Sequence, residues 1–361
     1  MANIISIATA VPAYCHRQSD ILYFMQQAYN LDETDKRKLA FLYHHSGIKQ
    51  RHSVLNEFSL PPQQWQFINI ESEEATPLDT RMKLYKEHAL PLSLRAAQNC
   101  LNELNEEVTI THLITVSCTG MSAPGLDLEL VEALNLSPNI FRTSVNFMGC
   151  YAGIHALKLG KMICDSTPNA NVLIVATELC TLHFQEDYTP DNAASSLLFA
   201  DGSAALLLSN DKSKKPLASI DKFHSYISFY GKKDMAWEIS NKGFLMTLSG
   251  YVPQLIEHDI SALVNDALKE SNLEINDIDY WCVHPGGKRI VDAIQKQLKL
   301  SDEAVQQSRN VLNEFGNMSS ATIFFVLKEI CKNKHKQSAS PLLGVAFGPG
   351  LTMETFTATV V

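Results

Sequence analysis

The chain has 361 residues, of which 45% are hydrophobic and 19% are charged, enough for a large core or two fused domains. Its formal net charge of −9 excludes a basic nucleic-acid-binding protein, and no run of lysine and arginine indicates a membrane surface. The eight cysteines include no CxxC motif and no short metal-binding spacing, which predicts reduced thiols, no metal site and a cytoplasmic protein.

The first part of the chain is predicted to contain one strand and three helices. An apolar segment ends at Pro12, and it is predicted as a buried strand because no basic residue precedes it, unlike in a signal peptide. Helical spacing follows over residues 19–29, 33–44 and 80–104, and the polar, proline-containing segment 53–78 is predicted to be an irregular surface excursion. No apolar stretch approaches the roughly 18 residues needed to span a membrane.

Strands and helices then alternate. Strands are predicted at 110–118, 141–147 (a short buried strand) and 172–176, helices at 126–134 and 152–163, and two short strand pieces at 197–199 and 204–208. Such alternation is typical of a mostly parallel sheet covered by helices, which makes the chain an α/β protein. The polar, charged run at 210–215 is the predicted boundary between two domains, 1–213 and 214–361.

The second part repeats the outline of the first. We predict an apolar helical face at 260–268, a strand at 280–283, helices at 290–298 and 318–331, a brief extended piece at Val311, and strands at 342–347 and 352–361. Each half contains a strand, a glycine turn and a helix that opens on a reactive or polar residue, Cys150 in one and Asn317 in the other. This pattern indicates an internal duplication.

Cys150 is the candidate nucleophile. It follows a strand and the turn at Gly149 and precedes a helix, so we expect it at a helix N-terminus, where the dipole favours a thiolate. The alternative is a small buried side chain in a strand–helix joint. Taken alone, His284 at a strand end is explained by a structural role, and Asn317 taken alone is explained as a helix cap. Together the three suit thioester chemistry, in which a thiolate takes an acyl group and His and Asn donate hydrogen bonds to a carbonyl oxygen.

Four segments carry a resemblance to a known family. GCYAG at 149–153, HPGG at 284–287, GNMSSAT at 316–322 and AFGPGLTMET at 346–355 closely resemble the type III polyketide synthases, the chalcone synthase-like family. The separations of Cys150, His284 and Asn317 are also similar to those of the family, and the resemblance extends over nearly the whole chain.

The resemblance implies a thiolase-like α-β-α-β-α layered fold of two pseudo-duplicated halves that works as a homodimer. Cys150 would be loaded from an acyl-CoA, while His284 and Asn317 would hold the thioester carbonyl of malonyl-CoA as carbon dioxide leaves. The resulting carbanion would extend the acyl chain by two carbons, without a metal or redox cofactor. The implied activity is that of an acyltransferase releasing a short pyrone, resorcinol or phloroglucinol type of product.

The resemblance also implies a substrate pocket whose residues depart from the family pattern. Phe199 matches a gatekeeper and Met246 stands at the second gatekeeper position; Gly348 and Pro349 belong to the scaffold loop that closes the site, and Ser319 to the segment after Asn317. Trp237 replaces a small glycine, and three positions that hold threonine in the plant enzymes are Cys118, Cys180 and His183. Only Lys38 keeps the basic character of the CoA tunnel, since Phe41 and His45 stand at other basic positions. An acyl-carrier-protein starter therefore stays open beside acyl-CoA.

Three other functions are weighed. A single-round 3-ketoacyl synthase of fatty-acid or quinolone type would share the three catalytic residues but perform one condensation. A non-catalytic condensing-fold subunit has no need to keep all three residues. In a cysteine protease or hydrolase, the asparagine and the glycine loops would have no role.

Overall fold

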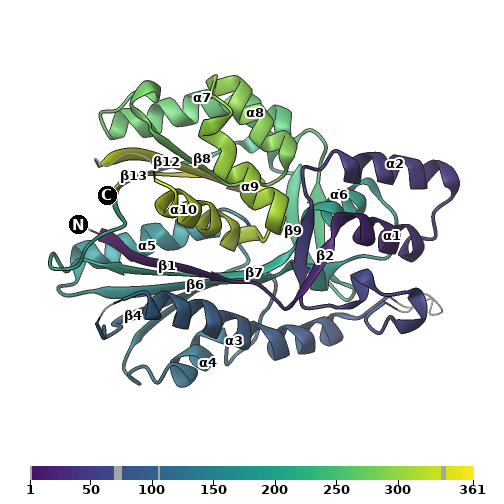
Figure 1. Cartoon of the computed structure of the whole chain (residues 1–361), viewed down its shortest axis with the longest axis horizontal. Coiled ribbons are helices and arrows are strands. Elements are labelled where there is room, and N and C mark those ends of the chain that lie inside the picture. The colour runs from purple at the N-terminus through teal and green to yellow at the C-terminus, as the bar shows by residue number, and fades with distance from the viewer. Residues whose placement is uncertain (1, 69–74, 105, 335–338) are drawn as a thin grey trace.

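The computed structural model describes residues 2–68, 75–104, 106–334 and 339–361. Figure 1 shows five layers, in which two groups of strands alternate with three layers of helices. The outer helices are α7 and α8 on one side and α3 and α4 on the other, with α5 and α10 between the two groups of strands. Their bounds are Leu78–Asn102 (α3), Leu126–Ala133 (α4), Ala152–Ser166 (α5), Val252–Glu270 (α7), Lys288–Leu298 (α8) and Thr322–Lys332 (α10). The predicted α-β-α-β-α layering is confirmed.

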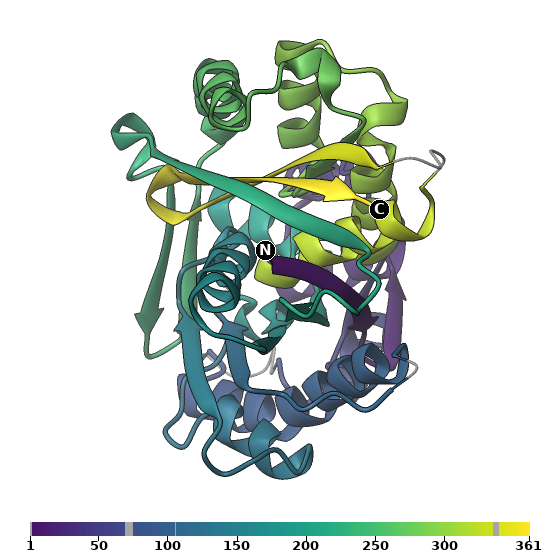
Figure 2. The same cartoon turned by 90° about the vertical axis from the view of Figure 1, so that its left-hand side faces the viewer.

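The strands form one sheet in the order β11-β12-β13-β8-β1-β7-β6-β4-β5. Their bounds are Ala2–Ala10 (β1), His112–Ser117 (β4), Phe141–Asn146 (β5), Asn171–Leu179 (β6), Asp201–Ser209 (β7), Ala218–Ile227 (β8), Tyr280–Val283 (β11), Ser340–Gly348 (β12) and Thr352–Val360 (β13). In Figure 2 the strands β8, β12 and β13 cross the middle of the molecule, between the upper helices and the N-terminal strands. Both chain ends lie beside Leu217, whose amide donates to Ile4 (2.8 Å) and whose carbonyl accepts from Val361 (3.0 Å).

The pairing pattern displays the internal duplication. From the central β1–β8 pair, β1 is followed by antiparallel β7, antiparallel β6 and parallel β4. In the other direction, β8 is followed by antiparallel β13, antiparallel β12 and parallel β11. The expectation of a mostly parallel sheet is therefore wrong, because parallel pairs occur only towards its two ends. The loop between β7 and β8 contains the 213/214 division, which stays a prediction.

Most predicted elements are present, including α1 (Gln18–Ala28) and α2 (Glu33–His44). Two predicted extended pieces are wholly or partly helical instead. Residues 197 and 198 end α6 (Pro190–Leu198), which begins with the Thr189 side chain accepting from Asn192 N (3.1 Å) and with Pro190 in its first turn. Phe199 is extended, as predicted, and forms an isolated β-bridge with Asn317. Val311 lies on the buried face of α9 (Gln306–Phe315), together with Ser308 and Leu312.

Two segments differ from their predicted burial. Strand β5 is at the edge of the sheet, and Phe141 is 71% exposed, so the expected buried strand is wrong. In the segment 53–78, Val54, Leu55 and Phe58 are buried, so it is not only a surface excursion. The carboxylate of Glu57 accepts from three successive amides, residues 66–68, and thereby folds the segment back on itself. Residues 69–74 lie outside the described ranges.

Four short strands complete the frame of the site. Neither the antiparallel pair of β2 (Tyr14–Arg17) and β3 (Gln50–Ser53) nor the hairpin of β9 (Met235–Ser240) and β10 (Gly243–Leu248) was predicted from the sequence. Beside them lies a short turn of 3-10 helix, η3 (Cys180–His183), which follows β6.

Candidate active site

Cys150 lies in the turn between β5 and α5, as predicted. Gly149 has a φ of +87°, a conformation that side chains rarely adopt, and a Cβ there would come within 2.1 Å of Pro349 Cδ. The turn of the first half is thus packed against the closing loop of the second half. Gly348 is equally confined, because a Cβ on it would lie 2.6 Å from the Tyr151 ring. The two loops hold Cys150 at the bottom of a cavity, with 9% of its surface exposed.

His284 and Asn317 come from the second half of the chain. His284 directly follows β11, where its amide donates to Val345 O (2.9 Å). Its two ring nitrogens are buried, and within the described part of the chain they have no hydrogen-bond partner. Asn317 follows α9, and its Oδ1 accepts from the amide of Ser319 (2.8 Å). Asn317 Nδ2 contacts Gly286 O at 3.4 Å, a long hydrogen bond that leaves this donor weakly engaged.

One cavity joins these residues. Cys150, His284 and Asn317 line it together with most of the predicted pocket residues, namely Cys118, Cys180, Phe199, Trp237, Met246, Ser319 and Pro349. Residues missed in the sequence also line it, among them Thr119, Met235, Leu248, Ile290 and Phe347. The cavity is mainly apolar, so the few polar groups that face it are poorly shielded by water and can act strongly on a bound thioester.

Burial opposes the sequence-based expectation of a resting thiolate. It raises the pKa of Cys150 to about 12, with Ser319 lowering and the Glu178 carboxylate further raising that value. Burial also lowers the pKa of His284 to about 3. The pair is therefore a thiol and a neutral imidazole, and the helix N-terminus does not outweigh desolvation.

Glu178 is a functional candidate that sequence reasoning missed. It is fully buried near the end of β6, where it accepts from Cys118 N (2.9 Å), Thr119 Oγ1 (3.2 Å) and the Ser320 hydroxyl. Burial raises its pKa to about 7, although these three donors lower it. A single charged residue within the mainly apolar strand from Val172 to Leu179 was the available signal.

Trp237 and His183 are held in an aromatic wall. The indole Nε1 of Trp237 donates to Cys118 O (2.9 Å), and its ring meets the edge of His183 at 5.7 Å. His183 stacks on Phe244 at 4.2 Å, and its nitrogens contact Thr119 O (3.0 Å) and Phe244 N (3.2 Å). Since one contact requires a donor and the other an acceptor, His183 is neutral, in agreement with the fall of its pKa to about 3 on burial.

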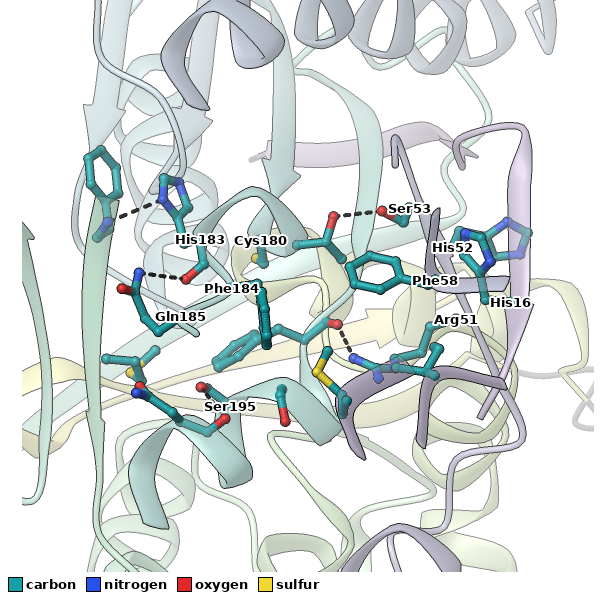
Figure 3. Close-up of a pocket in the computed structure, with 18 of the residues that line it drawn as sticks. His16, Arg51, His52, Ser53, Phe58, Cys180, His183, Phe184, Gln185 and Ser195 are labelled. Carbon is teal, nitrogen blue, oxygen red and sulfur yellow. Dashed lines mark hydrogen bonds between the residues drawn. The ribbon is translucent and has the colours of Figure 1, made fainter. Parts of the chain in front are cut away.

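A second cavity adjoins the first (Figure 3). The two share Cys180, Phe199, Trp237 and Met246, which separate them. His183 lines only the second cavity, so the structure does not bring it to the cavity of Cys150. The remaining walls of the second cavity come from β2, α1, β3, η1 (Glu57–Ser59), η3 and the two residues after it, α6 and β10.

A third cavity, here called the outer opening, lies beside the turn that follows His284. This wider, largely apolar cavity of about 500 Å³ shares Gly286, Ile290 and Leu248 with the inner one, and Phe41 and His45 line it. Its cationic side chains are Lys288 and Arg289, which sequence reasoning missed. Lys38 does not line this opening; it is exposed on α2, where its Nζ pairs with Asp35 (2.8 Å).

Over the ranges given above, no helix is both long and apolar enough to cross a membrane. Within the same ranges, no three histidine, cysteine or acidic residues are grouped so that they could hold a metal ion.

Comparisons with known proteins agree with this geometry. Residues 1–212 match the model for "Chalcone and stilbene synthases, N-terminal domain", and residues 227–361 match that for the C-terminal domain. A "Putative chalcone synthase" of Bacillus subtilis is 32% identical, over 98% of this chain and 97% of the relative. "Alpha-pyrone synthesis polyketide synthase-like Pks18" of Mycobacterium tuberculosis is 31% identical, over 98% and 90%.

Solved structures give the same result. PKS-I from the brown alga Ectocarpus siliculosus superposes with a TM-score of 0.93 at 30% identity, over 100% of this chain and 98% of that one. The C-terminal type III polyketide synthase domain of Steely1 from Dictyostelium superposes with a TM-score of 0.92 at 26% identity, over 100% and 99%.

Proposed function

Since the chain belongs to the family of chalcone and stilbene synthases, and is a type III polyketide synthase, we propose that Cys150, His284 and Asn317 carry out its condensation reaction. Enzymes of this family are decarboxylating acyltransferases that use acyl-CoA and malonyl-CoA. The observation that carries the proposal is the pair of buried, unpartnered ring nitrogens of His284 in the cavity of Cys150. Buried polar atoms require partners, and a bound thioester supplies them.

In the loading step, Cys150 Sγ attacks the carbonyl carbon of an acyl-CoA thioester. The bond from carbon to Cys150 forms, and the bond to the sulfur of CoA breaks. The thiol proton passes to His284 as the attack proceeds and then to the departing CoA thiolate, so CoA leaves as a thiol. Because the resting pair is neutral, His284 acts as a general base rather than as a standing cation.

In the extension step, malonyl-CoA loses carbon dioxide, and the electrons of the broken bond form an enolate. His284 and Asn317 Nδ2 donate hydrogen bonds to the enolate oxygen, in a cavity where such donors are most effective. The enolate carbon then attacks the acyl-Cys150 thioester, and Cys150 leaves as a thiolate that recovers a proton. The product is a 3-ketoacyl-CoA two carbons longer. Repeated extension followed by ring closure would give a pyrone, resorcinol or phloroglucinol type of product.

The proposed function also gives roles to the residues of the cavity wall and to the two halves of the chain. We assign Phe199, Met246, Trp237, Cys118 and Cys180 to the walls around the growing chain, since all of them line the cavity of Cys150. The proposed reaction requires no metal or redox cofactor, because each step moves only protons and electron pairs between the named groups. The proposed division, 1–213 and 214–361, gives the nucleophile to the first half and His284 and Asn317 to the second.

We also propose a cytoplasmic homodimer. Strand β5 is the last strand of the sheet, and its outer edge presents unpaired backbone groups and the exposed ring of Phe141. Such an edge is protected when a second chain covers it. A monomeric mass in solution would contradict this part.

The test is to incubate the protein with malonyl-CoA and a series of starter thioesters, and to analyse protein and products by mass spectrometry. We expect an acyl adduct on Cys150, and no adduct or product from Cys150→Ala. Cys282→Ala is the matched control, since Cys282 is buried behind the site beside Ile323 O. An acyl group mapped to another cysteine would refute the assignment, and a product of one condensation would favour a single-round ketoacyl synthase.

A further inference from the structure

The second cavity suggests which starter this enzyme takes, an inference that rests on the proposed function. We propose that the cavity between α1, η1 and α6 receives the apolar tail of a straight-chain acyl starter, while its thioester end lies at Cys150. Figure 3 shows the side chains that surround this space. In this proposal the tail passes from the cavity of Cys150 through the wall that the two cavities share.

The chemistry of the second cavity favours an apolar occupant. Apolar side chains, including Ile21, Met25, Phe58 and Phe184, provide most of its surface. Two of its polar groups already pair with each other, since the hydroxyls of Ser53 and Thr181 lie 2.7 Å apart. An acyl tail can therefore be buried there without leaving many polar groups unsatisfied.

Arg51 brings an unsatisfied polar atom to this wall. It is buried, and it donates through Nε to Gln18 (2.9 Å) and through Nη1 to the carbonyl of Phe199 (2.5 Å), whereas its Nη2 has no hydrogen-bond partner among the residues that the structure describes. A tail ending in a carboxylate could reach this nitrogen. That alternative is one outcome of the test below.

The shared wall has one adaptable member. Trp237 is fixed by its hydrogen bond to Cys118 O, and the backbone of Phe199 by Arg51. Met246 makes no hydrogen bond through its side chain, and its unbranched thioether rotates into irregular spaces. The second cavity encloses about 40 Å³, room for a short apolar group, so a longer tail must displace Met246 to enter.

The test compares starters of different length in variants that fill the second cavity. Ser195 lines this cavity but not that of Cys150, so Ser195→Leu adds volume only there, and Ser195→Ala is the matched control. The measured quantity is the ratio of kcat/KM for octanoyl-CoA to that for acetyl-CoA. We expect a fall of at least about tenfold in Ser195→Leu, because roughly fourfold in affinity is lost for each methylene group left unburied. Ser195→Ala should keep the wild-type ratio.

Two further variants test the inference in case Ser195→Leu does not fold. Ile21→Phe fills the cavity from α1, and Met246→Phe replaces the adaptable side chain by a rigid ring; both should lower the same ratio. Unchanged ratios in folded Ser195→Leu and Ile21→Phe would overturn the inference while leaving the proposed function intact. Better loading of a carboxylate-terminated starter than of octanoyl-CoA would overturn the apolar assignment in favour of Arg51. Absence of any acyl adduct on Cys150 would overturn the proposed function and this inference with it.

Discussion

Glu178 should make the stability of this protein depend on pH in a direction opposite to that of an ordinary carboxylate. Its side chain is fully buried, and burial raises its pKa from 4.5 to about 7, against the opposing effect of three hydrogen-bond donors. The folded protein therefore keeps a proton that the unfolded chain releases between these two values. Because the unfolded state binds fewer protons in that window, the free energy of unfolding falls as pH rises from about 4.5 to about 7.

The size of the effect follows from the shift. The difference between about 7 and 4.5 is roughly 2.5 pKa units, and each unit corresponds to about 1.36 kcal/mol, so the contribution of Glu178 falls by about 3 kcal/mol. The buried groups Asp201, His183 and His284 also have shifted pKa values. They are present in both wild type and Glu178→Gln, and their contributions cancel in the difference between the two proteins.

Urea unfolding at about pH 4.5 and about pH 7.5 measures this difference. Glu178→Gln loses hydrogen bonds and should be less stable than wild type at the lower pH. The advantage of the wild type should shrink by about 3 kcal/mol at the higher pH, where its carboxylate is charged. Glu238→Gln, at an exposed position on β9, controls for the loss of a carboxylate. The same difference in stability at both pH values would refute the raised pKa.

Two further predictions concern catalysis. Asn317→Ala should still form the acyl-Cys150 adduct, measured by intact-protein mass. Its rate of malonyl-CoA decarboxylation, measured by release of carbon dioxide, should fall about 10²–10³-fold, the usual cost of losing one oxyanion donor. Equal loss of both half-reactions would contradict this division of roles. Arg289→Ala should raise KM for both CoA substrates by several-fold, because Arg289 lines the outer opening, whereas Lys38→Ala should change KM less. If Lys38→Ala raised KM more than Arg289→Ala in steady-state kinetics, the CoA moiety of the substrate would extend along α2 instead.

The sequence predicted well what depends on local chemistry. Cys150 before α5, His284 after β11 and Asn317 after α9 are each placed by a glycine turn or a strand end that is visible in a few neighbouring residues. The alternation of strands and helices predicted a helix-covered sheet but not its antiparallel centre, and the five layers came from the family resemblance. That centre depends on pairings between distant segments, such as Asn3 with Ser219, which no local pattern encodes.

What the sequence could not predict depends on distant contacts or on burial. The second cavity joins residues near Ile21 and Phe58 to residues near Ser195, and no periodicity connects these segments. The thiolate expected for Cys150 was wrong for a related reason, because local position shows the helix N-terminus but not the desolvation of the cavity. Family resemblance supplied the pocket positions, and the neutral, stacked state of His183 became visible only with Phe244 beside it.

The contact between Gly149 and Pro349 has a consequence for the biosynthesis of the protein. A ribosome releases the cysteine long before it has made the loop that packs against the turn of that cysteine. Strand β13, which lies between β12 and β8, is made later still. Until Pro349 has been made, the nascent chain therefore holds Cys150 without the loop that confines its turn. If the proposed mechanism holds, we expect a chain truncated before this loop not to consume acyl-CoA.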